Sequence, residues 1–68
     1  MYGNLYLALK EKGVRQSDVA QLLKLSKQSV YMKLHGIRDF TAPEMYAIKE
    51  NYFPNGNMEE LFKKREQI

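Results

Sequence analysis

The 68-residue sequence contains no cysteine, only one histidine, two prolines and four glycines. Without cysteine, disulfides and thiolate metal sites are excluded, and a single histidine cannot build a histidine-rich metal site. Few helix breakers combined with a 44% hydrophobic composition argue against intrinsic disorder. The sequence therefore predicts a folded protein that uses no metal and no other cofactor.

Catalytic groups are equally scarce. Apart from scattered serines and His35, the chain offers no nucleophile with a base and an orienting group. It also has no glycine-rich loop that would cradle a phosphate. We therefore expect a protein that is not an enzyme.

Long apolar runs are absent as well. No stretch approaches the roughly 18 apolar residues of a membrane span. The N-terminal segment lacks a basic region followed by an apolar one, the pattern of a secretory signal. We therefore expect no membrane partner and a cytoplasmic location.

Charge is unevenly distributed along the chain, although the formal net charge is only +3. No acidic residue occurs from Val19 to Arg38, and this stretch contains the basic residues Lys24, Lys27, Lys33 and Arg38. An acid-free basic stretch suits a polyanionic partner. On charge alone, a solvated lysine-rich face is an equally good interpretation.

Turn-forming residues divide the chain into five short segments that have the apolar spacing of helices. The expected helices are Asn4–Lys12, about Gln16–Leu23, a third from Ser26 to before Gly36, a fourth that opens at Thr41, and a short fifth capped by Asn57. No convincing hairpin interrupts them. The predicted fold class is an all-α bundle of five helices, formed by residues 1–68 as a single domain.

Capping residues support these boundaries. Asn4 and Ser26 are N-cap candidates, because a side-chain oxygen there accepts from a free amide of the first turn. Thr41 and Glu44 have the spacing of a capping box. Gly13 is placed to end the first helix in the left-handed conformation.

The connection between the second and third helices is the most informative feature. It has three residues at most, about 24–26, which is too short for an antiparallel return, so the two helices must cross steeply as in a helix-turn-helix. Ala20 supplies the small side chain that such a crossing needs, and Leu25 fills the space at the turn. The core shared by the two helices is expected to contain Val19, Leu23 and Val30.

This pattern resembles a known family. Gln16-x-x-Val19-Ala20-x-x-Leu23-x-Leu25-Ser26-x-x-x-Val30, ending at Gly36, resembles the helix-turn-helix of the phage repressor and Cro family. The run Lys33-Leu34-His35-Gly36-x-x-x-Phe40-Thr41-x-x-Glu44-Met45 is similar to a subgroup of small phage and prophage regulators of Gram-positive bacteria. Together the two matches cover about residues 5–55, and the motif itself covers about 16–36.

The resemblance implies a lambda-repressor-like bundle that binds operator DNA to regulate transcription in a phage or prophage switch. The cytoplasm of a bacterial host, at its nucleoid, is the implied location. The third helix would enter the major groove with its N-terminus first, while the second would lie across the backbone. The residues expected to face bases are Lys27, Gln28, Ser29 and Met32. Those expected at phosphates are Gln16, Lys24, Tyr31, Lys33 and Arg38.

The chemistry of these side chains fits the implied roles. Gln28 can pair with adenine through two hydrogen bonds, and Lys27 can donate to guanine O6 and N7. Met32 suits a thymine methyl group, but packing in the core is nearly as good an interpretation. For the other side chains, the competing interpretation is an ordinary solvated surface.

Two positions depart from the family pattern. Lys24 occupies the turn position that is usually glycine, where a left-handed conformation strains a side chain by roughly 1–2 kcal/mol. Arg15 occupies the N-cap position of the second helix, where the family often has threonine or serine. Ser17 is the alternative cap, two residues further on.

The resemblance also bears on the oligomeric state, and the sequence leaves a second function open. One helix-turn-helix reads few base pairs, so two-fold dimers on symmetric operators are expected. The candidate dimer surface contains Met58, Leu61, Phe62 and Ile68, and closing the bundle is an equally good interpretation of the last helix. The rival function is an anti-repressor that acts by binding a partner repressor protein.

Overall fold

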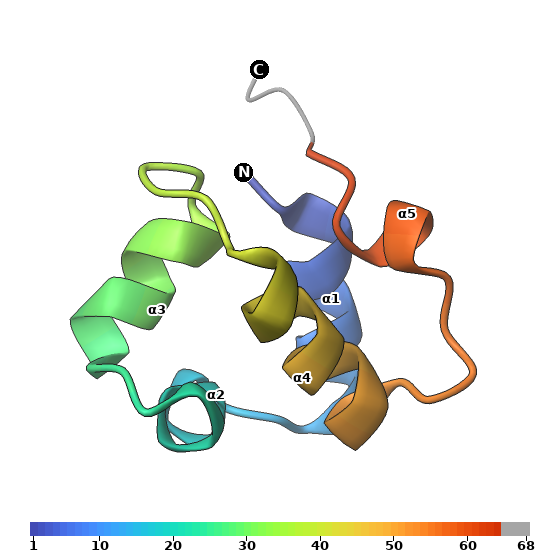
Figure 1. Ribbon diagram of the computed structural model, residues 1–68, viewed down its shortest axis with the longest axis horizontal. Helices are drawn as coiled ribbons and strands as arrows, with labels where there is room; N and C mark the ends of the chain where they lie inside the picture. Colours follow the sequence, from blue (N-terminus) through green and yellow to red (C-terminus); the bar gives the residue numbers. More distant parts are fainter. Residues whose placement is uncertain (65–68) are drawn as a thin grey trace.

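The computed structural model describes residues 1–64, and within them the chain forms five α-helices and no strand (Figure 1). The helices are α1 (Gly3–Lys12), α2 (Gln16–Leu23), α3 (Lys27–Leu34), α4 (Ala42–Tyr52) and α5 (Met58–Leu61). The all-α prediction with five helical segments is confirmed. Ile68, one of the candidate dimer residues, lies outside the described residues.

Three of the predicted N-caps are confirmed. Ser26 Oγ accepts from the backbone N of Ser29 at 3.1 Å, which starts α3. At the start of α4, the Thr41 amide donates to Glu44 Oε1 at 2.9 Å and the Glu44 amide donates to Thr41 Oγ1 at 3.4 Å. Asn57 Oδ1 accepts from the first turn of α5. Local side-chain chemistry therefore fixes the starts of α3, α4 and α5.

The predicted cap of α1 is wrong. This helix begins at Gly3, after Tyr2, and no side chain caps it. Asn4 lies inside the first turn, and its Nδ2 donates to the backbone carbonyl of Glu60 at 2.9 Å. The Asn4 side chain therefore connects α1 to α5, because the chain brings α5 alongside this turn.

The N-cap residue of α2 is Arg15, and Ser17, the alternative cap, lies inside the first turn of the helix. The amide of Arg15 donates to Asp18 Oδ2 at 3.0 Å, so the carboxylate three residues ahead supplies the capping hydrogen bond. Asp18 also places a negative charge at the positive end of the helix dipole. These interactions explain how an arginine occupies the N-cap position.

Two glycines end helices in the left-handed conformation. Gly13 has φ +76° after α1, as predicted. Gly36 has φ +80° after α3, and a Cβ there would lie 3.0 Å from the backbone nitrogen of Met1. Both positions favour glycine because a side chain would be strained at these φ values.

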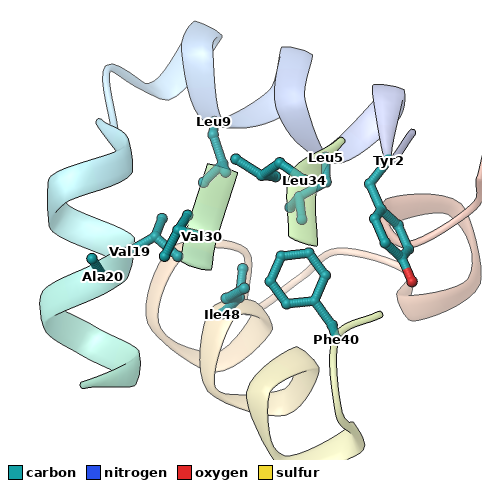
Figure 2. Packing of buried hydrophobic residues seen from close by; sticks show 9 residues of the cluster. All are labelled: Tyr2, Leu5, Leu9, Val19, Ala20, Val30, Leu34, Phe40 and Ile48. Atoms are coloured by element: carbon teal, nitrogen blue, oxygen red, sulfur yellow. The ribbon is translucent and has the colours of Figure 1, made fainter. Parts of the chain in front are cut away.

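One hydrophobic cluster joins the first four helices and the α3–α4 loop (Figure 2). Its buried members are Tyr2, Leu5, Leu9, Val19, Ala20, Val30, Leu34, Phe40 and Ile48. Leu23 and Leu25 pack against the cluster while remaining partly exposed. The expected contribution of the α2–α3 segment to the core is therefore confirmed.

The end of the described chain completes this core. Leu61 of α5 is buried, and the Phe62 ring lies 6.2 Å from the ring of Tyr2 and 5.7 Å from that of Phe40. The apolar side chains of Leu61 and Phe62 therefore close the bundle. Of the candidate dimer residues, Leu61 is thus buried within one copy, while Met58 and Phe62 are half-buried.

The turn between α2 and α3 contains the strained residue that the sequence predicted. Lys24 has φ 58° and ψ 43°, and it is the only non-glycine residue with positive φ in residues 1–64. The next amide, that of Leu25, donates to the carbonyl of Ala20 at 2.9 Å and closes the turn. Figure 1 shows α2 almost end-on while α3 runs across the view, so the two helices cross steeply.

Replacing Lys24 by glycine should therefore stabilise the fold. Relief of left-handed strain, less the extra backbone entropy of glycine, leaves a gain of about 0.5–1 kcal/mol in the free energy of unfolding. Lys24→Ala, which removes the charge and keeps the strain, is the matched control. Denaturant unfolding of the two variants checks this, and a glycine variant no more stable than Lys24→Ala would mean that the strain at residue 24 does not exceed the entropy cost of glycine.

Candidate nucleic-acid interface

The N-terminal half of α3 presents a polar face to solvent. Val30 and Leu34 point into the core (Figure 2), and the exposed residues of the helix are Lys27, Gln28 and Tyr31. Lys27 and Gln28 in the first turn are exposed, and Tyr31, one turn further along, is 48% exposed. The structure therefore brings two of the four predicted base-contacting residues and one predicted phosphate-contacting residue onto one outward face.

The other two predicted base-contacting residues are less accessible. Ser29 is half-buried, and its Oγ accepts a hydrogen bond from Ser26 Oγ at 3.0 Å. Met32 is also half-buried, and its carbonyl accepts from the amide of Ile37 at 2.9 Å. The Ser29 hydroxyl thus bonds to the N-cap residue of α3, and Met32 is not among the exposed residues of the helix.

A hollow of about 450 Å³ opens where the last turn of α1 and the first turns of α2 and α3 meet. Its polar lining includes Lys10, Arg15 and Lys27, together with Gln16 and Ser17. Leu9, Val14 and Leu34 supply its apolar part, and no acidic side chain of the described chain lines it. Three cations from separate elements therefore converge on one concave surface.

The start of α2 adds to the positive potential of this hollow. Gln16 and Ser17 form the first helical positions, where backbone amides without helical partners and the positive end of the dipole attract anions. Asp18 partly opposes this, since its Oδ2 lies 3.6 Å from Arg15 Nε. That pair is weak because the Arg15 side chain is 81% exposed and screened by water.

The sequence pattern missed Lys10 and Arg15 as site residues. The acid-free stretch that drew attention to the basic residues begins at Val19, and both of these lie before it, next to Glu11 and Asp18. Only the packing of α1 against α3 brings Lys10 toward Lys27. A pattern along the chain could not have shown this convergence.

Lys33 has a different environment from the other predicted phosphate contacts. Its Nζ lies 2.8 Å from Glu44 Oε1 and 3.2 Å from the carbonyl of Asp39, and its side chain is only 12% exposed. It also lies 5.9 Å from the centre of the Phe40 ring. Lys33 therefore ties the end of α3 to the start of α4 and is largely withdrawn from the surface.

Lys24 and Arg38 are exposed, but neither lines the hollow. Lys24 lies in the α2–α3 turn, and Arg38 lies in the loop between α3 and α4. The ring of Tyr31 stacks on His35, with 4.1 Å between the ring centres. Lys24 and Arg38 are therefore exposed cations outside the hollow, and Tyr31 contacts a neighbour on its own helix segment.

Glu44 is the acidic partner in the Lys33 contact, and its environment favours the ionised form. Burial opposes ionisation, but the hydrogen bond from Lys33, the backbone amide of Thr41 and the charge of Lys33 together hold the pKa of Glu44 below its ordinary value of 4.5. Because the pKa is lower in the folded state, this stabilisation is complete above about pH 4.5 and is lost as the pH falls through the folded value.

Acidification should therefore destabilise the fold partly through Glu44. We expect Glu44→Gln to cost about 1–2 kcal/mol at neutral pH and to flatten the fall in stability below about pH 4.5. Glu50→Gln, at an exposed position of the same helix, is the control and should keep the wild-type pH profile. Thermal melts across this pH range check the effect, and parallel profiles for wild type and Glu44→Gln would contradict it.

Comparisons with known proteins add no identification, since no protein family model, curated protein or solved structure matches the chain. Among the described residues, no group of three or more histidines, cysteines or acids could hold a metal ion. Within that same part of the chain, no helix is long and apolar enough to cross a membrane. The features that bear on function are thus the all-helical fold and the basic face, formed by the exposed start of α3 and the hollow beside it with Lys10, Arg15 and Lys27.

Proposed function

We propose that the protein is a helix-turn-helix regulator that binds double-stranded DNA sequence-specifically, as a repressor or Cro-like protein of a phage or prophage switch. The observation that carries the proposal is the steep α2–α3 crossing beside an acid-free hollow with three cations. The resemblance of residues 16–45 to phage regulators supports the same function.

In this proposal α3 inserts its first turn into the major groove. Lys27 and Gln28 meet base edges because they are exposed at the leading end of the helix. Gln28 recognises adenine through N6 and N7, and Lys27 donates to guanine O6 and N7. Ser29 and Met32 contribute less to base recognition because both are half-buried.

The hollow takes the sugar–phosphate backbone. Gln16 and the free amides of α2 contact one phosphate, and Lys10 and Arg15 supply the charge that attracts it. Lys24 and Arg38 contact phosphates beyond the hollow, on either side of α3. Lys33 has no phosphate in this arrangement because Glu44 already neutralises it.

Two copies on a symmetric operator would supply the specificity that one short helix lacks. The contact between copies cannot draw much on Leu61 and Phe62, which are packed in the bundle. The proposal therefore expects the dimer to form chiefly on DNA. Sedimentation of the protein alone should show a monomer, and of its operator complex two copies per site.

Paired substitutions of two glutamines test the docking. Gln28→Ala should relax base preference at one operator position by about 1–3 kcal/mol of discrimination, whereas Gln16→Ala should weaken binding to all duplexes alike. Selection of bound duplexes from a random library, repeated with each variant, provides the measurement. Identical changes in the two variants would overturn the assignment of Gln28 to bases and Gln16 to the backbone.

A further inference from the structure

A second concave surface lies between α1 and α5. It has a volume of about 390 Å³, and its apolar part comes from Leu7, Ala8, Gly56 and Leu61. Leu7 is 49% exposed and lies beside Ala8, Gly56 and Leu61, so its apolar surface is continuous with theirs in one concave patch. The groove therefore offers apolar surface that the protein itself does not cover.

The groove has a fixed geometry. Asn4 Nδ2 donates to the carbonyl of Glu60 at 2.9 Å and holds the two helices together at one end. At the other end, a Cβ on Gly56 would lie 3.0 Å from Leu61 Cδ1 and 3.1 Å from Phe53 Cβ, so close packing fixes the loop that enters α5. A preformed groove of this kind binds a partner without first having to be ordered.

The charge of the groove is opposite to that of the hollow beside α3. Glu11 and Glu60 line it, and no lysine or arginine of the described chain does so. Both acids are exposed, and neither takes part in an ion pair within residues 1–64. The chain is basic overall, yet this surface combines an exposed leucine with two unneutralised carboxylates.

From these features we propose that the α1–α5 groove binds a basic amphipathic segment of another protein. An apolar side chain of the partner would cover Leu7, and its lysines or arginines would pair with Glu11 and Glu60. Such complementarity favours encounter and excludes acidic competitors. In Figure 1, α5 lies on the opposite side of the molecule from α3, so this binding leaves the basic face open.

The same features disfavour two other occupants. DNA phosphates would be repelled by Glu11 and Glu60. A second copy that packed its own groove here through a two-fold axis would bring the carboxylates of one groove against those of the other, which costs free energy because no cation lines either. The proposal does not depend on the DNA-binding function, because it uses a different surface and different residues.

A synthetic helical peptide of leucine and lysine, with leucines at i and i+4, is the probe. Titration followed by amide NMR should shift the resonances of Leu7, Ala8, Gly56 and Leu61. Leu7→Ala, and separately the double variant Glu11→Gln/Glu60→Gln, should each weaken peptide binding about tenfold. Glu50→Gln on α4 should leave it unchanged, and a peptide with glutamates in place of the lysines should not bind.

Several results would overturn the proposal. One is equal binding of the lysine and glutamate peptides, and another is wild-type affinity in the groove variants. Resonance shifts on α2 and α3 instead of the groove would place the peptide elsewhere. Self-association that is lost in the glutamate double variant would make a second copy the occupant. None of these results bears on DNA affinity, which the groove variants should retain.

Discussion

Leu5→Ala is expected to leave most of the protein unfolded at room temperature. The Leu5 side chain is 0% exposed and lies at the centre of the cluster in Figure 2. Truncating a fully buried leucine costs about 2–5 kcal/mol, because apolar burial is lost and a cavity remains. A single core in a chain of this size rarely supplies more than about 3–5 kcal/mol in total. The loss of one side chain is therefore comparable to the whole stability of the fold.

Leu7→Ala is the matched control for this effect. Leu7 lies two residues further along the same helix but is 49% exposed, so its truncation should cost less than about 1 kcal/mol. Circular dichroism melts of both variants provide the measurement. A Leu5→Ala protein with the melting temperature of Leu7→Ala would contradict the packing described for α1.

The second large effect concerns salt. The proposed interface has four open cations for phosphates, Lys10, Arg15, Lys24 and Arg38, since Lys27 is assigned to bases and Lys33 is withdrawn by its ion pair. If each of the four neutralises one phosphate, the slope of log affinity against log salt is about −3.6. The affinity for duplex DNA should then fall about 150-fold between roughly 50 and 200 mM salt. Fluorescence anisotropy with a labelled duplex measures it.

Single substitutions show which cations produce the salt effect. Arg15→Ala and Lys10→Ala should each lower the magnitude of the slope by about 0.9, whereas Lys33→Ala should leave it unchanged in the folded protein. Lys49→Ala is a further control, because Lys49 lies on α4 and its Nζ donates to the carbonyl of Pro54 in the loop that follows. If the affinity of the wild-type protein hardly depends on salt, so that the slope is close to zero, the proposed phosphate contacts are wrong.

The helices were predictable from the sequence because their signals are local. A serine, threonine or asparagine at the N-cap acts within one turn of chain, as Ser26 and Thr41 do. The predicted N-cap at Asn4 is wrong for a tertiary reason. The Asn4 side chain donates through Nδ2 to the carbonyl of Glu60, which lies 56 residues away. No rule about neighbouring residues contains that contact.

The site was predictable only in part, for the same reason. The exposed position of Gln28 follows from helical periodicity once Val30 and Leu34 are assigned to the core, whereas Lys27 shares their i, i+3, i+7 spacing and is exposed at the first position of the helix. The pairing of Lys33 with Glu44 and the convergence of Lys10 and Arg15 on the α3 hollow depend on how the helices pack. Sequence periodicity gives the face of a helix, but it does not give the partner across the space between helices.

The apolar residues of α5 show the same limit of sequence-based prediction. In a helix of four residues, apolar side chains such as Leu61 can face the bundle or a second copy, and the pattern is the same for both. In the structure Leu61 is buried, and the ring of Phe62 lies 6.2 Å from that of Tyr2. The exposed apolar residue beside α5 is instead Leu7 of α1, which belongs to a different segment of the sequence.

The position of DNA on the protein is the most direct test of the central claim. Short duplex DNA, added at low salt to isotope-labelled protein, should shift the amide resonances of Gln16, Lys27 and Gln28, and those around Lys10 and Arg15. The amides of Leu7, Gly56 and Leu61 should stay in place. If no duplex binds at low salt, or if the shifts gather in the α1–α5 groove, the helix-turn-helix function proposed for this protein is wrong.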